Sequence, residues 1–484
     1  MRTRDSSRAS PSQRPTSRIP FGVGARFDRL RRRARGAPPN QASSSSTPRS
    51  VPIPHLPHLH RQTPQPASSP PKSNPPAPTN RDAYIAALEA RMRQMEKVPT
   101  SSFYHSYAGE FDTLLTVDRR AVRSLSEFET STRVENAYRN RYANILSNER
   151  TRVKLQEIAP GGNDYINANF VTGHCRHPGY IATQAPLPET TPHFWQMVYE
   201  SVSPVIIMLT REQEDFCEVV KSDQYWPPTG ENLLFHDYLV HGIDEKVDTQ
   251  RGLIERYFQV GRVVDKRKKH ARDLVHADSL IPPASDSSVW ETPARGRTQT
   301  VCDDDQYDCS DEELFRNLEL IGPVLDVVQL QYLDWPDQNV PAHPRTLLDL
   351  CQRVDEILSA HYLKTTVSAP PIVHCSAGVG RTGTFIAIDR TLRRLWDAFS
   401  QGISPEPVPV EEIRELVRQL KNERSKMVQT AEQYRFIFEA VLAGMRSWCQ
   451  GKALFGSQPY SRDPNSCNGN NIPTVKQRPA NQDG

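Results

Sequence analysis

Ten residues, HCSAGVGRTG at positions 374–383, constrain the fold of this chain more than any other segment. The apolar run at 370–373 begins with two prolines and predicts a short buried strand. Apolar residues at helical spacing across 385–399 predict a helix after the segment. A strand, a glycine-rich turn and a helix in this order direct backbone N–H groups and the positive helix end at one point. We expect an anion to bind at that point, next to Cys375.

Other interpretations of the segment are weaker. Its glycines also fit G-x-G-x-x-G, a dinucleotide-binding pattern, but that interpretation gives no role to Cys375 or Arg381. A nucleoside-triphosphate P-loop is excluded because no G-K-[ST] follows. A thiol that only packs is the usual state of a cysteine, yet three glycines and an arginine would be an unfavourable way to end a strand. A lone Cys-x5-Arg would occur by chance roughly half the time in this composition, so other segments must test the interpretation.

A carboxylic acid on a separate loop would complete this chemistry. If Cys375 attacks a phosphate ester, the leaving oxygen needs a proton from an acid that can close over the site. Trp335-Pro336-Asp337 follows a strand-like run at 327–333 and supplies that acid. In isolation this tripeptide would most often be a turn. Its position upstream of Cys375 favours the catalytic interpretation.

These segments resemble the signature loop and the WPD loop of the tyrosine-specific protein tyrosine phosphatases. Further stretches from about residue 101 to 448 resemble the same family in the same order; they are 139–144, 164–168, 183–188, 224–227 and 427–434. The sequence departs from the family at Gln338-Asn339, which follow the WPD tripeptide. The resemblance implies an α/β fold with a twisted, mostly parallel mixed sheet flanked by helices. The site would lie at the carboxyl end of a strand.

The resemblance also implies the catalytic roles. Cys375 would attack phosphorus, Asp337 would protonate the tyrosyl oxygen, and Arg381 would hold two phosphate oxygens through its planar guanidinium. Gln429 would position the hydrolytic water, and Thr382 would hydrogen-bond the departing thiolate.

The nucleophile should be present as a thiolate. A free thiol ionises near pH ~8.5, so only a few per cent is reactive at neutral pH. We expect the loop amides, the helix end, Arg381 and His374 to favour the ionised form. The loop dipoles and Arg381 supply the positive charge, and no metal-binding spacing occurs, so neither a metal nor another cofactor is expected.

Selectivity for tyrosine requires a deep site with an aromatic wall. By resemblance, Tyr142 would stack on the substrate ring, and Asn144 would bind the peptide backbone where the family often has Asp. An amide accepts a hydrogen bond more weakly than a carboxylate. The other expected substrate-binding residues come from the signature loop, the glutamine loop and the loop before 224–227; they are Ser376, Ala377, Gly378, Val379, Gly380, Arg381, Gln433, Lys221 and Glu214.

Composition divides the chain into one large domain and unstructured flanks. With 41 prolines and a mean hydropathy of −0.63, much of the chain is too polar to enter a core. Residues 1–80 form a basic, Pro- and Ser-rich arm that is predicted to be disordered, and 81–100 form a leading helix. The catalytic domain would span 101–450 with a polar insertion at about 264–313. Residues 451–484 read as a disordered tail.

The same features predict a monomeric, non-receptor enzyme. No apolar run approaches the ~18 residues needed to span a bilayer, and the cysteines lack paired spacing. A working thiolate needs a reducing compartment, so we expect the cytoplasm, with the nucleus as the alternative because of the basic run at 29–35. A mitochondrial presequence ranks third because prolines oppose its helix. Expected partners are phosphotyrosyl signalling proteins such as mitogen-activated kinases, with a kinase docked at 49–54, and not nucleic acid.

Two other functions remain open on the sequence. A catalytically idle phosphotyrosine-binding module of the same fold would be expected to lack the cysteine, the acid or the arginine, and all three are present. A dual-specificity phosphatase would normally lack the loop that carries Tyr142. Hydrolysis of phosphotyrosine on proteins is therefore the favoured prediction.

Overall fold

The structure is a computed structural model of the 484-residue chain. It describes residues 80–98, 105–121, 125–156, 162–174, 177–214, 220–266, 318–336, 339–401, 409–452 and 454–456. The predicted basic arm up to residue 79, most of the polar insertion and the tail beyond residue 456 lie outside these ranges. Asp337, the predicted general acid, also lies outside the described residues.

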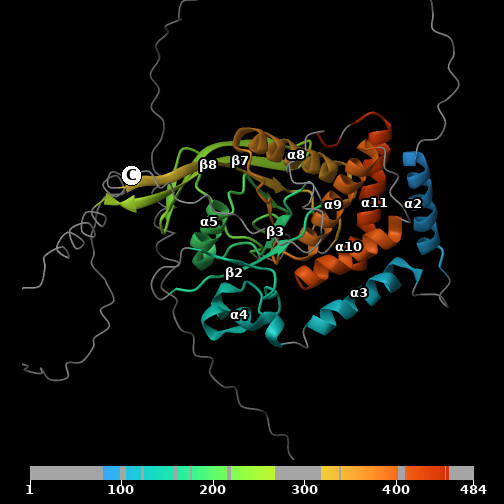
Figure 1. The fold of residues 1–484 in the computed structure, drawn as a ribbon, viewed down its shortest axis with the longest axis horizontal. Helices are drawn as coiled ribbons and strands as arrows, with labels where there is room; N and C mark the ends of the chain where they lie inside the picture. Colours follow the sequence, from blue (N-terminus) through green and yellow to red (C-terminus); the bar gives the residue numbers. More distant parts are fainter. Residues whose placement is uncertain are drawn as a thin grey trace, which may run out of the picture. The chain divides into compact units, whose positions relative to one another are not determined.

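Within the described ranges, nine strands form one mixed sheet (Figure 1). In spatial order they are β1 (Arg152–Lys154), β2 (Tyr165–Val171), β3 (Tyr180–Thr183), β9 (Ile372–His374), β4 (Val205–Met208), β8 (Leu318–Tyr332), β7 (Leu253–Asp265), β6 (Tyr238–Asp248) and β5 (Asn232–Phe235). The long strands β7 and β8 run on past the sheet as a two-stranded ribbon toward the insertion.

The predicted α/β class with a mixed sheet is confirmed, but the sheet is parallel only at its centre. The neighbours β3, β9, β4 and β8 pair in parallel. All other neighbouring pairs are antiparallel; a hairpin turn joins β5 to β6 and β6 to β7, whereas β7 and β8 are separated in the chain by the insertion. The expectation of a mostly parallel sheet was therefore wrong for the outer strands. The signature segment predicts the strand that leads into its own helix, but it does not predict the direction of the other strands.

The three central strands end at one edge of the sheet. Thr183 of β3 and Met208 of β4 both stand in register with His374 of β9. Because these strands run parallel, the residues that follow them, including Cys375, emerge side by side at the carboxyl edge. The predicted location of the site follows from this register.

Two apolar cores lie on opposite faces of the sheet, as the alternation of side chains along β4 shows. Val205 and Ile207 belong to the larger core, and Ile206 and Met208 to the smaller one. Helix α5 (Thr191–Glu200) covers the smaller core. The larger core lies under α8 (Arg345–Thr365), α9 (Gly380–Ser400), α10 (Pro409–Glu423) and α11 (Ala431–Cys449). Short helices η2 (Leu125–Phe128), α4 (Glu129–Thr132), η3 (Val134–Arg139) and η4 (Pro188–Thr190) fill the loops.

The first two long helices of the described ranges pack on the outside of this layer. Helix α2 (Asn80–Glu96) lies where the sequence predicts the leading helix and contacts α10 and α11. Helix α3 (Tyr107–Ala121) packs against α10 and α11 as well (Figure 1). In α2, the buried residues Tyr84, Leu88 and Met95 recur at helical spacing and join the larger core.

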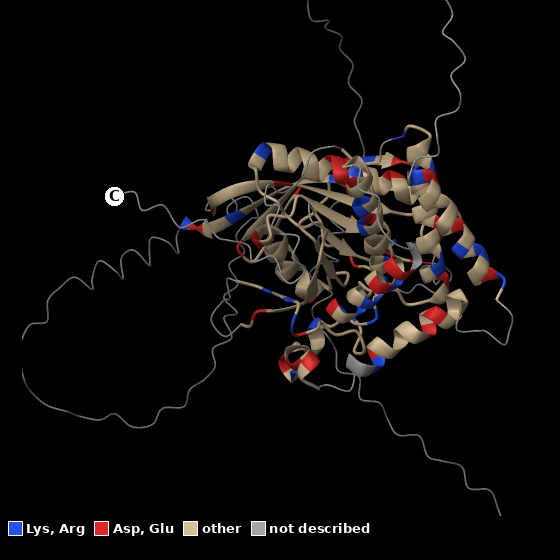
Figure 2. Cartoon of the chain, turned by 45° about the vertical axis from the view of Figure 1, so that its right-hand side comes forward, with Lys and Arg blue, Asp and Glu red and all other residues tan. Residues whose placement is uncertain are grey.

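Charged residues are concentrated on the helices and the ribbon rather than on the central strands (Figure 2). The central strands β3, β4 and β9 contain no Lys, Arg, Asp or Glu and are buried along their whole length. This distribution is expected of strands covered on both faces. None of the helices in the described ranges is long and apolar enough to cross a membrane.

Candidate active site

The signature segment forms the predicted strand, turn and helix. Strand β9 ends at His374, the turn follows, and α9 begins at Gly380. Cys375 is 5% exposed, and its Sγ accepts a hydrogen bond from the Gly378 N–H at 3.2 Å. A backbone donor and the positive end of α9 therefore lie beside the thiol sulfur.

Close approach of neighbouring segments explains the three glycines. Gly378 has φ +71°, and a Cβ there would overlap the carbonyl of Thr183 at the end of β3. A Cβ on Gly380 would overlap the side-chain oxygen of Gln429, and one on Gly383 would lie 2.6 Å from the Val428 nitrogen. The glycines thus allow β3 and the loop before α11 to contact the turn.

Arg424 binds two carbonyls of the turn, a role that no sequence pattern indicated. This fully buried side chain donates to the carbonyls of Gly378 at 2.9 Å and Ala377 at 3.2 Å. Its other bonds go to the side-chain oxygens of Asn169 at 2.7 Å and Asn167 at 2.9 Å. Burial lowers the pKa of Arg424 to about 10, so it stays charged at neutral pH. Because the carbonyls point toward Arg424, the turn keeps them away from the sulfur.

Arg381 and Glu214 form a buried two-bond ion pair. The Arg381 Nη2 lies 2.7 Å from one carboxylate oxygen, and Nη1 contacts the other. Thr210 donates to the same carboxylate at 2.7 Å. Arg381 also donates to the Pro336 carbonyl at 3.3 Å. The carboxylate fixes the plane of the guanidinium, and the proline contact brings the WPD segment to the site.

The predicted acid loop is described only on either side of Asp337. Trp335 is 2% exposed, and its indole N–H donates to the Asn339 carbonyl at 2.9 Å. The bond therefore spans residues 337 and 338. Before Asp337, the Pro336 carbonyl contacts the Arg381 side chain and Trp335 belongs to the larger core. These contacts support an acid loop beside Arg381.

Tyr142 reaches the signature turn. Its hydroxyl lies 2.8 Å from the Ser376 Oγ. Ser376 in turn donates to the Lys221 carbonyl at 2.7 Å, so Tyr142 is the donor of the first bond. Asn144, two residues after Tyr142, is exposed, and its backbone carbonyl accepts from the Lys426 ammonium at 2.7 Å. The structure therefore places Tyr142, Ser376 and Lys221 together and Asn144 at the rim.

His374 is neutral, and each of its two ring nitrogens makes one hydrogen bond. Its Nδ1 lies 3.0 Å from the Cys375 carbonyl, which can only accept, so Nδ1 carries the proton. Its Nε2 then accepts from the Tyr225 hydroxyl at 2.7 Å, and Tyr225 accepts from Gln329 at 2.8 Å. Complete burial lowers the pKa of His374 to about 4. His374 can therefore act on Cys375 by orienting its backbone, and not by carrying a charge.

Gln429 and Gln433, the two glutamines of the 427–434 motif, lie against the first residue of α9. Gln433 accepts from the Gln429 N–H at 2.8 Å, and its own N–H donates to Thr430, the N-cap of α11, at 3.1 Å. Gln429 is exposed, and its side-chain oxygen lies against Gly380. Among the described residues, the buried Oγ1 of Thr382 has no hydrogen-bond partner. The Gln429 side chain thus contacts the first residue of α9, and Thr382 lies in the first turn of that helix.

The arrangement can hold a tetrahedral anion next to a sulfur nucleophile. It combines a backbone donor, a helix end, a fixed guanidinium and an aromatic wall, which are groups that stabilise negative charge on phosphate. Within the described ranges, no group of three His, Cys, Asp or Glu side chains is placed to bind a metal ion.

Comparison with known proteins agrees with this chemistry. A sequence model of the Protein-tyrosine phosphatase family matches residues 136–279 and 295–443. Tyrosine-protein phosphatase Lar-like of Caenorhabditis elegans is 34% identical over 66% of the chain, and Tyrosine-protein phosphatase Lar of Drosophila melanogaster is 31% identical over 65%. Receptor-type tyrosine-protein phosphatase F of Mus musculus is 31% identical over 65%. The matches cover only 11%, 12% and 13% of these three relatives, so the chain corresponds to a small part of each.

Proposed function

Because this chain belongs to the protein-tyrosine phosphatase family, we propose that it hydrolyses phosphotyrosine on proteins through a cysteinyl-phosphate. The observation that carries the proposal is the turn at Cys375, where the Gly378 N–H meets the sulfur while Arg424 holds the carbonyls on the other side. Such a turn stabilises the thiolate and the phosphate with the same backbone donors.

In the first step, the Cys375 thiolate attacks phosphorus. The S–P bond forms, the bond from phosphorus to the tyrosyl oxygen breaks, and Asp337 gives its proton to that oxygen. Arg381 binds two phosphate oxygens, and its plane is already set by Glu214. General acid catalysis of this kind contributes about 10²–10⁴-fold.

In the second step, water attacks the phosphorus of the intermediate. The S–P bond breaks, Cys375 leaves as a thiolate, and the proton of the water passes to the Asp337 carboxylate. Gln429 positions the water, which its exposed place beside Gly380 supports. The unpartnered hydroxyl of Thr382 is available to donate to the departing sulfur.

The bond between Tyr142 and Ser376 supports selectivity for tyrosine. It fixes the aromatic ring at the wall of the site, where it can stack on a phenyl ring. A dual-specificity enzyme does not need such a wall. The idle-module alternative is disfavoured because Cys375 and Arg381 are both present and both held in a polar site.

Further details stay predictions. We propose an enzyme that acts as a monomer in the cytoplasm or nucleus on signalling proteins such as mitogen-activated kinases. The relatives include proteins named receptor-type, so the non-receptor form rests on the sequence argument alone. The proposed kinase-docking segment at 49–54 lies outside the described residues.

The test compares hydrolysis of phosphotyrosyl and phosphothreonyl forms of one peptide. The wild-type chain should release phosphate from the first and not appreciably from the second. Cys375→Ser should abolish turnover, while Cys449→Ser, a change at an exposed cysteine outside the site, should leave it intact. Equal rates on both peptides would favour the dual-specificity alternative, and binding without turnover in the wild type would favour the idle module.

A further inference from the structure

Helix α3 contacts the loop that carries Gln429, although it lies outside the region matched by the family. The match begins at residue 136, whereas α3 ends at Ala121. Its contact with the loop is made by Asp118, which is 9% exposed. The family match therefore does not account for this contact.

The carboxylate of Asp118 binds the loop at two points. One oxygen accepts from the backbone N–H of Lys426 at 2.6 Å. The other accepts from the ammonium of Lys421 at 2.8 Å. Lys421 is 0% exposed, and it also donates to the Val428 carbonyl at 3.1 Å. A single carboxylate thus fixes the backbone of the loop at residue 426 directly and at residue 428 through Lys421.

Both of these backbone positions are strained. Lys426 has φ +66° and Val428 has φ +59°, although a β-branched residue rarely adopts the left-handed region. Such conformations cost about 1–3 kcal/mol each and persist only where surrounding contacts impose them. The remaining backbone group of Val428, its N–H, donates to the Val379 carbonyl of the signature turn at 3.1 Å. Gln429 is the next residue, so its position depends on this strained backbone.

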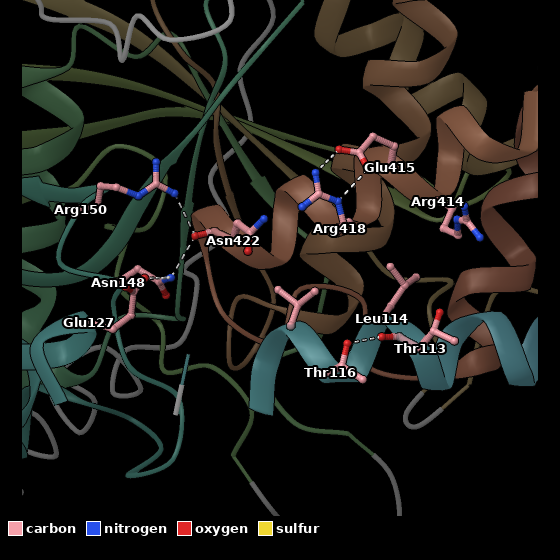
Figure 3. A pocket seen from close by; sticks show the side chains of 11 residues that line it. Thr113, Leu114, Thr116, Glu127, Asn148, Arg150, Arg414, Glu415, Arg418 and Asn422 are labelled. Carbon is pink, nitrogen blue, oxygen red and sulfur yellow. Dashed lines mark hydrogen bonds and ion pairs between the residues drawn. The ribbon is translucent and has the colours of Figure 1, made fainter. Parts of the chain in front are cut away.

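A second segment of the chain, just before β1, also binds the end of α10. Asn148 and Arg150 both donate to the carbonyl of Asn422, at 3.2 and 3.3 Å (Figure 3). A cavity of about 510 Å³ lies beside them and is lined by both α3 and α10. Near this space, Asp118 joins α3 to the loop and to the end of α10 by hydrogen bonds.

We infer that Asp118 is a positioning residue for the hydrolysis of the cysteinyl-phosphate, acting through Lys421 and the Lys426–Val428 backbone on Gln429. The inference rests on the proposed function and on the role proposed there for Gln429. Asp118 does not touch the substrate. Its loss would leave the attack of Cys375 intact and would impair the second step, in which Gln429 holds the water.

Rapid-quench kinetics with an aryl phosphate separate the two steps. Phenol release reports formation of the cysteinyl-phosphate, and phosphate release reports its hydrolysis. In Asp118→Asn we expect the first rate to be unchanged and the second to fall about 10–100-fold, which is the usual effect of displacing a positioned group by about 1 Å. A burst approaching one phenol per enzyme should appear, followed by slow turnover.

Glu110→Gln is the matched control on the same helix. Glu110 is also buried and paired, but its partners are Arg91 of α2 and the Tyr434 hydroxyl of α11. We expect it to lower thermal stability about as much as Asp118→Asn while leaving the ratio of the two rates unchanged. If Asp118→Asn does not fold, Lys421→Gln carries the same expectation, because it also removes the ion pair.

The outcomes separate this inference from the proposed function. A wild-type chain that neither releases phenol nor forms a phosphoenzyme would refute the function and the inference together. A wild type that turns over, with both rates lowered equally in Asp118→Asn, would refute the inference alone. A similar change of ratio in Glu110→Gln would also refute it, since the effect would then come from loosening α3 in general.

Discussion

Replacing Arg424 by lysine should both destabilise the domain and weaken the nucleophile. The guanidinium makes four hydrogen bonds to acceptors in a fully buried place, and two of these acceptors are carbonyls of the signature turn. An ammonium keeps the charge but reaches about two of the four acceptors. Each buried acceptor left without a donor costs about 1–3 kcal/mol, so Arg424→Lys should lose about 2–6 kcal/mol of unfolding free energy.

The catalytic effect follows from the same contacts. Where the ammonium leaves the carbonyl of Ala377 or Gly378 without a donor, the turn can rotate its peptide planes, and the Gly378 N–H no longer points at the Cys375 sulfur. Alkylation of Cys375 by iodoacetamide at neutral pH should then become slower, because the sulfur has lost the backbone donor beside it. The activity kcat/KM on an aryl phosphate should fall in parallel.

Urea unfolding measures the first effect and alkylation across pH measures the second. Arg435→Lys is a suitable control, since this arginine is exposed and its ion pairs within the described ranges are with Glu96 and Glu439 on the surface; it should change neither. The reasoning is refuted if Arg424→Lys lowers the unfolding free energy but leaves the alkylation rate at its wild-type value. Packing alone would then explain the buried arginine.

Substitutions at four further positions test the other contacts of the site. Asp337→Ala should lower kcat about 10²–10⁴-fold without weakening phosphopeptide binding, and an unchanged kcat would assign the acid elsewhere. Tyr142→Ala should reduce the preference for phosphotyrosine over phosphothreonine, whereas Tyr142→Phe should keep the ring and most of the preference. Glu214→Gln should raise KM for phosphopeptide because Arg381 loses its fixed plane; a KM equal to that of the wild type would contradict this role. Because burial lowers the pKa of His374 from 6.5 to about 4, the unfolded chain gains a proton that the folded one does not. This contribution to stability is complete above pH ~6.5 and is lost as pH falls toward 4, by about 2 kcal/mol at pH 5, and urea unfolding of His374→Gln should lack that part of the acid sensitivity.

Local patterns in the sequence were sufficient to predict the strand, turn and helix that carry Cys375 and Arg381. The strand, turn and helix around Cys375 form as expected, because the glycines permit the turn and the apolar periodicity changes from strand to helix there. Tyr142, Ser376, Lys221 and Gln433 lie near this turn or the start of α9. The resemblance of the motifs brought these residues together before any contact was known.

The partners that hold the site were decided by tertiary structure alone. Arg381 meets Glu214 across 167 residues of chain, Arg424 meets Gly378 across 46, and Lys421 meets Asp118 across 303. No periodicity or spacing in a single sequence reports contacts at such separations, because they arise only when the strands and helices have packed.

The protonation state of His374 was also decided by the tertiary structure. In the sequence it is a histidine beside a cysteine, and only burial in the folded protein makes it neutral. Likewise, the sequence indicated a parallel pairing at the site but could not show that antiparallel strands surround it. The amino-acid pattern alone therefore determined the turn that contains Cys375, since this turn depends on neighbouring residues. The orientation of the turn, the charge beside it and the placement of Gln429 required the fold, since they depend on burial and on residues that are distant in the chain.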